Sequence, residues 1–126
     1  MNVVDSSGWL EYFADGPNAK FFAAPIEAVA SLLVPTISIY EVFKRVLQQR
    51  GEGSALQATA LMHQGAPVDL TPSLALSAAR LSLEESLPMA DAIMLATARS
   101  HRATLWSQDA DFERIAGVKF VARRSR

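Results

Sequence analysis

Four acidic residues of this sequence are placed where they can act together. Asp5 follows the first apolar segment of the chain, and Asp109 follows a later one. Glu41 and Asp91 lie where helices are predicted to begin, and Asp111 comes two residues after Asp109. In parallel α/β sheets, the loops that lead from strands into helices lie at one edge of the sheet. We therefore expect these carboxylates to meet there and to bind a hard cation through oxygen.

Carboxylates gathered at one place repel one another. Two of them about 4 Å apart interact unfavourably by about 4 kcal/mol at an effective dielectric constant near 20. A fold would not bring several such pairs together unless a cation compensated them or some bound protons. The sequence has no cysteine, and His63 and His101 lie far apart. Oxygen ligands without histidine or cysteine favour Mg²⁺ or Mn²⁺ over softer metals.

Each acid also has an ordinary structural interpretation. Ser38 and Glu41 match the capping box, in which the Glu41 side chain would bond to the amide of Ser38. Asp91 would complement the dipole of its helix, Asp109 is a good N-cap, and Asp5 suits a turn. The functional hypothesis therefore depends on the convergence of the four acids and not on any one of them.

Short apolar segments alternate with helical ones along the chain. The predicted strands comprise residues 3–4, 32–35, 68–71, 104–107 and 119–121. The predicted helices are one capped by Ser6 or Ser7 and broken near Gly16, a short one containing Phe21, Phe22 and Ile26, and others over residues 38–50, 53–64, 72–85, 88–102 and 109–116. In the helix 53–64 we expect Leu56, Ala60 and Leu61 to face inward. This alternation predicts one α/β domain over residues 1–126, with a short parallel sheet flanked by helices on both faces.

The composition is that of an ordinary globular protein. Half of the 126 residues are hydrophobic and a fifth are charged, which argues against disorder. No apolar stretch approaches the roughly 20 residues of a membrane span, and the amino terminus lacks the basic segment of a signal peptide, so we expect a cytoplasmic protein. The net charge is −1, but the last residues include Arg123, Arg124 and Arg126. A frayed, solvated end explains this basic tail as well as a function does.

Four stretches contain the acids: residues 3–10 (VVDSSGWL), 36–42 (TISIYEV), 87–98 (LPMADAIMLATA) and 105–112 (LWSQDADF). In order and spacing they resemble the PIN-domain family, and within it the small toxin ribonucleases of bacterial VapBC-type toxin–antitoxin pairs. The resemblance extends over essentially the whole chain, and the last two stretches together are its most specific part. Trp106 is bulkier than the usual aliphatic residue and Ser107 replaces the commoner threonine, but neither departure removes an acid.

The resemblance implies a single PIN domain that acts as a Mg²⁺- or Mn²⁺-dependent ribonuclease. The implied catalytic residues are Asp5, Glu41, Asp91 and Asp109. The implied metal ligands are Asp5, Asp91 and Asp109. Asp111 would be an outer ligand or would contact one of these ligands. Ser6 and Ser107 resemble the hydroxyl residues that orient water and carboxylates near the metal. The expected reaction hydrolyses RNA to a 5′-phosphate and a 3′-hydroxyl, since a divalent ion activates water and stabilises the leaving oxygen.

Basic side chains are expected to pair with the phosphates of single-stranded or looped RNA. The candidates are Lys44, Arg99 and Arg102, together with the basic tail. Arg99 and Arg102 are predicted to share a helix face, since they lie one turn apart. Solubilising charge on an exposed surface is an equally good interpretation of each.

The resemblance also implies an antitoxin protein that covers the site, and a homodimer. Candidate residues for an apolar groove are Trp9, Tyr12, Phe13, Tyr40 and Phe43, although Phe13 and Phe43 suit a core position better. Candidate residues for a dimer interface include Leu56, Leu61 and Met62. The residues themselves demonstrate neither partner.

Three other interpretations stay open. The chain could be a PIN nuclease of RNA processing outside a toxin–antitoxin pair. It could be a Mg²⁺-dependent phosphoryl-transfer domain. Haloacid-dehalogenase phosphatases, however, need an Asp-x-Asp near the first strand, and Ser7 stands at the second of these positions. The arrangement of acids found in response-regulator receiver domains is not found either. It could also be a catalytically silent binding module, but the intact acids at all four positions count against that.

Overall fold

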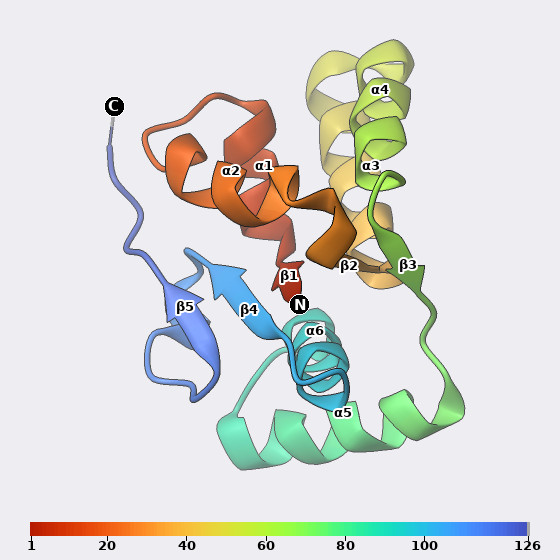
Figure 1. The fold of residues 1–126 in the computed structure, drawn as a ribbon, viewed down its shortest axis with the longest axis vertical. Coiled ribbons are helices and arrows are strands. Elements are labelled where there is room, and N and C mark those ends of the chain that lie inside the picture. Colours follow the sequence, from red (N-terminus) through yellow and green to blue (C-terminus); the bar gives the residue numbers. More distant parts are fainter. Residues whose placement is uncertain (126) are drawn as a thin grey trace.

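The computed structural model describes residues 1–125, and it contains a parallel five-stranded sheet with helices on both faces (Figure 1). The strands are β1 (Asn2–Val4), β2 (Leu32–Pro35), β3 (Ala66–Val68), β4 (Thr104–Ser107) and β5 (Val118–Phe120). Their order across the sheet is β3-β2-β1-β4-β5, and every neighbouring pair is parallel. The predicted α/β class is therefore confirmed. No helix among the described residues has both the length and the apolar character needed to cross a membrane.

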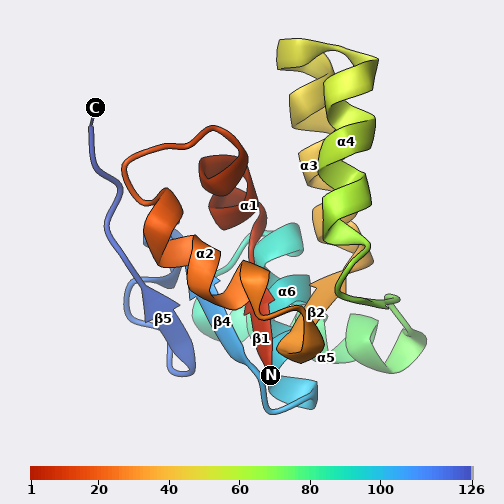
Figure 2. The same ribbon diagram turned by 45° about the horizontal axis from the view of Figure 1, so that its top comes forward.

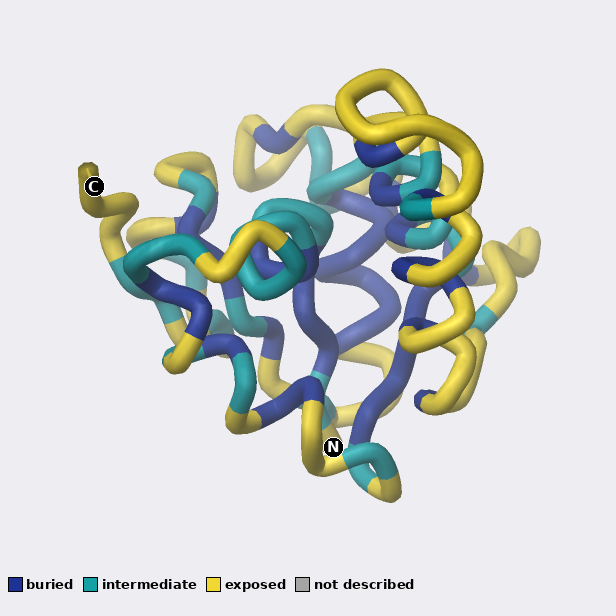
Figure 3. Tube along the Cα trace, turned by 90° about the horizontal axis from the view of Figure 1, so that it is seen from above, coloured by how far each residue is buried: buried dark blue, intermediate teal, exposed yellow. Residues whose placement is uncertain are grey.

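The sheet separates two apolar cores. The helices are α1 (Ser6–Phe13), α2 (Ala19–Glu27), α3 (Thr36–Arg50), α4 (Glu52–Met62), α5 (Pro72–Glu85) and α6 (Met89–Ser100), with short 3₁₀ turns η1 (Val29–Ser31) and η2 (Ala110–Phe112). Val3 belongs to the core formed with α5 and α6, whereas Val4 belongs to the core formed with α1 to α4. Successive residues of a strand point to opposite faces. Figure 3 shows the resulting concentration of buried residues at the centre of the molecule.

Helices α3 and α4 form an antiparallel arm that extends beyond the sheet (Figure 2). The expected inward face of α4 is wrong: Leu56 and Leu61 are 54% and 47% exposed, and Ala60 is exposed too. The buried residues of α4 are instead Ala55, Ala58, Thr59 and Met62. These are mostly small, which lets α4 pack closely on α3 while its leucines face solvent.

Several predicted boundaries differ from the structure. The strand expected over residues 68–71 is Ala66–Val68, because the Thr71 hydroxyl caps α5 by accepting from the Leu74 amide at 3.2 Å. Helix α3 begins before Ser38, whose hydroxyl donates to the Pro35 carbonyl at 2.6 Å. The helix expected over residues 109–116 is only the turn η2.

The aromatic residues also divide differently from expectation. Trp9 is 1% exposed and stacks on Phe13 with ring centroids 5.7 Å apart, so it belongs to the core and not to a surface groove. Tyr40 is exposed, whereas Tyr12 and Phe43 are half-buried. Met62, a candidate for a dimer interface, is fully buried against α3 and the sheet and therefore does not face a partner.

Candidate active site

Strands β1 and β4 lie side by side and bring their following residues to the same edge of the sheet. Val4 is paired with Trp106, and the Asp5 amide donates to the Trp106 carbonyl at 3.1 Å. Ser107 ends β4, and Asp109 follows two residues later. Both aspartates therefore leave adjacent parallel strands in the same direction, which is the placement expected from the sequence.

Asp5 is the N-cap of α1, the position that the sequence suggested for Ser6 or Ser7. Its Oδ1 accepts from the Gly8 amide at 3.0 Å and from the Ser7 hydroxyl at 2.7 Å. Its Oδ2 accepts from the Ser107 hydroxyl at 2.5 Å. The carboxylate is 2% exposed, so these three donors hold a buried group in one orientation.

Asp91, Asp109 and Asp111 form a tight group. Each offers a carboxylate oxygen, and these three atoms lie within 4.8 Å of one another. Asp91 comes from the first turn of α6, while Asp109 caps η2 by accepting from the Asp111 amide at 2.9 Å. Ser107 joins this group to Asp5, since its Oγ also accepts from the Asp109 amide at 2.9 Å.

Burial, together with neighbouring negative charge, changes the titration of two acids. Burial, reinforced by the negative charges of Asp109, Asp5 and Asp111, raises the pKa of Asp91 to about 7. Burial raises the pKa of Asp5 to about 6, although the hydrogen bonds from Ser107, Ser7 and Gly8 oppose this increase. A raised pKa means that the fold favours the protonated, neutral form of the carboxyl group. A cation bound to these carboxylates would neutralise their charge as the proton does.

Glu41 lies at the margin of this group. It is in the second turn of α3, and its Oε1 accepts from the Ser6 hydroxyl at 2.6 Å. The predicted capping box is therefore wrong as an account of Glu41, because Ser38 lies inside the helix and the carboxylate is bound to Ser6. Glu41 is absent from the group of acids with oxygens within 4.8 Å, but Ser6 ties it to the residue next to Asp5.

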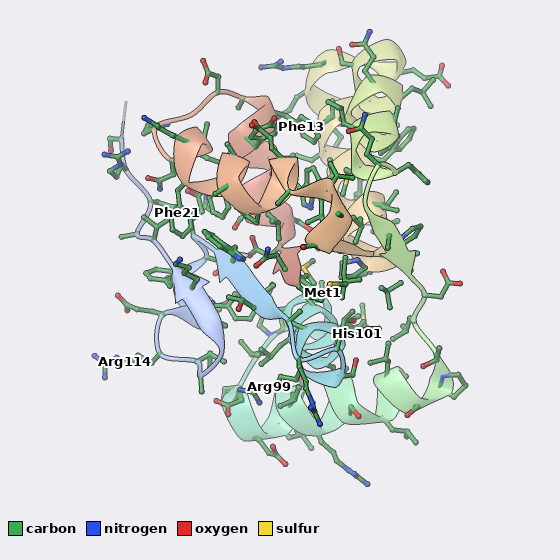
Figure 4. The ribbon with its side chains drawn as sticks, viewed as in Figure 1. Met1, Phe13, Phe21, Arg99, His101 and Arg114 are labelled. Carbon is green, nitrogen blue, oxygen red and sulfur yellow. The ribbon has the colours of Figure 1, made fainter. Side chains whose placement is uncertain are left out.

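The basic candidates occupy two different places. Lys44 is exposed on α3, one turn after Glu41, with its Nζ 5.8 Å from the Tyr40 ring centroid. Arg99 lies eight residues after Asp91 on α6, a rise of about 12 Å. Its guanidinium donates to the Ala116 carbonyl at 3.0 Å, and Figure 4 shows it in the lower part of the view, beside α5 and α6.

Arg102 does not share a helix face with Arg99, which corrects the prediction. Helix α6 ends at Ser100, and Arg102 has a left-handed backbone with φ of 53°. Both arginines lie at the end of α6 opposite to Asp91, so neither adjoins the three-acid group. Arg126 lies outside the described residues.

Three polar residues near the acids were missed by sequence reasoning. Ser7 donates to Asp5, as described above. Gln108 is 2% exposed; its Oε1 accepts from the Asn18 side chain at 3.0 Å, and its Nε2 donates to the Ser7 carbonyl at 3.4 Å. The pattern Asp-Ser-Ser-Gly, an N-cap acid followed by hydroxyl residues, could have indicated Ser7. Asn18 and Gln108 lie 90 residues apart, and no local pattern links them.

Comparisons with known proteins bear on the family and the fold of this chain. The family model described as PIN domain matches residues 3–118. A toxin–antitoxin complex from Klebsiella pneumoniae contains a chain with 26% identity and a TM-score of 0.78, covering 94% of this chain and 96% of the other. VapC20 from Mycobacterium tuberculosis, a toxin that cleaves the sarcin–ricin loop, has 16% identity, a TM-score of 0.77 and coverages of 92% and 95%.

VapBC2 from Rickettsia felis, solved with a DNA fragment from its promoter, has 13% identity and a TM-score of 0.74, with coverages of 96% and 97%. The similarities to VapC20 and to VapBC2 are at low sequence identity and therefore show a shared fold only. No curated protein sequence matches the chain. The family model and the solved structures thus cover nearly the whole chain.

Proposed function

This chain belongs to the PIN-domain family, and from that premise we propose that it is a divalent-metal-dependent endoribonuclease, the toxin of a toxin–antitoxin pair. Family and neighbours support the coarser statement that it is a nuclease. The observation that carries the finer proposal is the group of Asp91, Asp109 and Asp111 within 4.8 Å, joined to Asp5 by Ser107.

The donor set fits Mg²⁺ or Mn²⁺. All of its ligand atoms are carboxylate oxygens, which these hard cations prefer. Burial and then the negative charges of the neighbouring acids raise the pKa of Asp91, and a cation would offset those charges. We assign Asp91, Asp109 and Asp111 as ligands together with Asp5, whose oxygens retain acceptor capacity beyond their present hydrogen bonds. When bound, such an ion lowers the pKa of water and offsets charge on the phosphoryl oxygens.

The side chains of this chain then have distinct tasks. Ser107 fixes the position of Asp5 relative to the Asp109 backbone, because its hydroxyl bonds to both. Ser6 holds Glu41 at the margin of the site. We assign Glu41 to accept a hydrogen bond from the attacking water and to take its proton. The water oxygen bonds to phosphorus and the bond from phosphorus to the 3′-oxygen breaks. The products are a 5′-phosphate and, after protonation, a 3′-hydroxyl.

Cleavage of an end-labelled RNA tests the proposal. We expect cleavage with Mg²⁺ or Mn²⁺ and none with EDTA. We expect a loss of at least about a hundredfold for Asp91→Asn, because it removes a charged ligand of the proposed cation, which offsets the charge of the transition state. Asp69→Asn is the matched control, because Asp69 is an exposed acid of the loop before α5. Fragments that carry 3′-phosphates, or full activity of Asp91→Asn, would contradict the proposed chemistry.

We also propose an antitoxin protein as partner, because solved structures similar to this chain are described as toxin–antitoxin complexes. Such neighbours favour the toxin role over RNA processing outside a pair, and family membership favours a nuclease over the other phosphoryl-transfer domains considered above. The expected cytoplasmic location is part of the same proposal.

Co-expression with the product of an adjacent reading frame tests the antitoxin proposal, since an antitoxin would suppress cleavage.

The apolar surface of α5 and α6 supports a homodimer. A hollow of about 460 Å³ is lined largely by apolar side chains, including Leu70, Leu83, Met89 and Ile93. Leu83 and Met89 are 86% and 72% exposed, which is costly for large apolar groups that stay in water. We propose that a second copy covers this face. Its position differs from the one suggested by Leu56, Leu61 and Met62.

A further inference from the structure

The carboxyl-terminal segment after β5 is held against the loop between α1 and α2 (Figures 1 and 2). The Val121 amide donates to the Ser107 carbonyl at 3.0 Å, and the Asn18 side chain donates to the Ala122 carbonyl at 3.0 Å. The Arg124 guanidinium donates to Asn18 Oδ1 at 3.0 Å and also to the Pro17 carbonyl. We call these hydrogen bonds of Asn18 and Arg124 the clamp. Because Asn18 is 2% exposed, the clamp is anchored in the interior, and residues 121–124 are therefore not a frayed tail.

Arg123 lies between two clamped residues and lines a groove of about 440 Å³. Arg45 and Arg50 of α3 line the same groove, so cations from two distant parts of the chain lie along it. Among the described residues that line it, Glu11 is the one acid, and its Oε2 already accepts from the Asn18 amide at 2.7 Å. The groove therefore carries an excess of positive charge although the whole chain has a net charge of −1.

Two residues that line the groove adjoin the acidic site. Ser7 and Gln108 line it, and both contact residues of the site: Ser7 donates to Asp5, while Gln108 precedes Asp109 in the chain. A strand of nucleic acid that passes along the groove would thus bring a phosphodiester toward the carboxylates. A positive groove beside a negative site suits a polyanion that binds in the groove and is cleaved at the site.

We propose that Arg45, Arg50 and Arg123 bind backbone phosphates of the RNA substrate in this groove, a proposal that rests on the proposed ribonuclease activity. The clamped tail is then part of the substrate site, and Asn18 and Arg124 position Arg123. The groove also has apolar walls from Leu10 and Phe13. Three guanidinium groups against a single paired acid nevertheless favour phosphates over an apolar peptide.

Binding of a fluorescein-labelled oligouridylate, measured by anisotropy in EDTA, tests the proposal without cleavage. The test variant combines Arg45→Gln, Arg50→Gln and Arg123→Gln, all at exposed positions. The control combines Arg80→Gln, Arg99→Gln and Arg102→Gln, which removes the same charge from α5, the last turn of α6 and the turn that follows it. For single strands, each lost phosphate contact lowers the slope of log K against log salt by about 0.7, which is roughly fivefold in affinity at 0.1 M salt.

We expect the test variant to lose about 2 from the salt slope and roughly a hundredfold in affinity, and the control to bind like the wild type. Equal losses in both variants would mean that binding follows net charge, and no loss in the test variant would mean that the groove serves another occupant, such as a peptide. Either result overturns the proposal. If wild type binds RNA through the three arginines but cleaves none with metal, the ribonuclease proposal fails while the groove remains established.

Discussion

Asp91→Asn should stabilise the metal-free protein at alkaline pH. The wild-type carboxyl has a pKa of about 7 in the fold against 3.8 for the free group, because it is partly buried beside three other acids. A difference of three units corresponds to about 4 kcal/mol at full strength. Asp91 is only half-buried, so solvent screening reduces this, and we expect about 2 kcal/mol.

The direction of the pH dependence follows from proton binding. Between pH 4 and pH 7 the folded protein holds a proton on Asp91 that the unfolded chain has lost. The stability of the wild type must therefore fall as pH rises through this window and level off above it. Asparagine cannot ionise, so the variant should lose much less, with a remainder from Asp5, whose pKa is raised to about 6.

Urea unfolding in EDTA at pH 5 and pH 8 measures the effect. At pH 8 the variant should be more stable than the wild type by about 2 kcal/mol, or several degrees in melting temperature. Added Mn²⁺ should reverse the order, because the ion stabilises the intact set of ligands. The reasoning is refuted if Asp91→Asn is less stable than wild type at pH 8, or if both proteins and the Asp69→Asn control share one pH dependence.

Three further outcomes are expected. Ser107→Ala removes the shared hydroxyl between Asp5 and the Asp109 amide, so we expect a loss of about 1–3 kcal/mol in urea unfolding and slower cleavage. Gly8→Ala places a Cβ within 2.6 Å of Phe22 and should destabilise the fold by about 1–3 kcal/mol, which thermal melting measures. Leu83→Glu should yield monomers in light scattering if α5 and α6 form the dimer interface, and an unchanged mass would refute that interface.

The positions of the acids could be predicted because they depend on local features. Asp5 and Asp109 follow short apolar strands, and Asp91 begins a helix after Pro88, so each lies at the carboxyl edge once the sheet is parallel. The strands 32–35 and 104–107 and the helix 72–85 were predicted with the observed bounds. A few neighbouring residues determine where a strand ends and which residue caps a helix.

Other features depend on packing that local patterns do not contain. The leucines of α4 suggested a buried face, but α4 packs on α3 in an arm away from the sheet and buries its alanines instead. The clamp of Asn18 with Gln108 and Arg124 joins residues about 90 and 106 positions apart. Arg99 and Arg102 were expected near the acids, but a helix of this length carries them to the opposite edge of the sheet.

Capping and the proposed metal binding are compatible tasks for Asp5, although the sequence presented them as alternatives. A cap needs an acceptor for the Gly8 amide, and asparagine supplies one as well as aspartate does. The negative charge adds nothing that the cap requires, and in this buried position it opposes folding, as the pKa of about 6 indicates. Asp5→Asn should therefore keep the fold and abolish metal-dependent cleavage. If the variant cleaves RNA at the wild-type rate, the charge of Asp5 has no part in the chemistry.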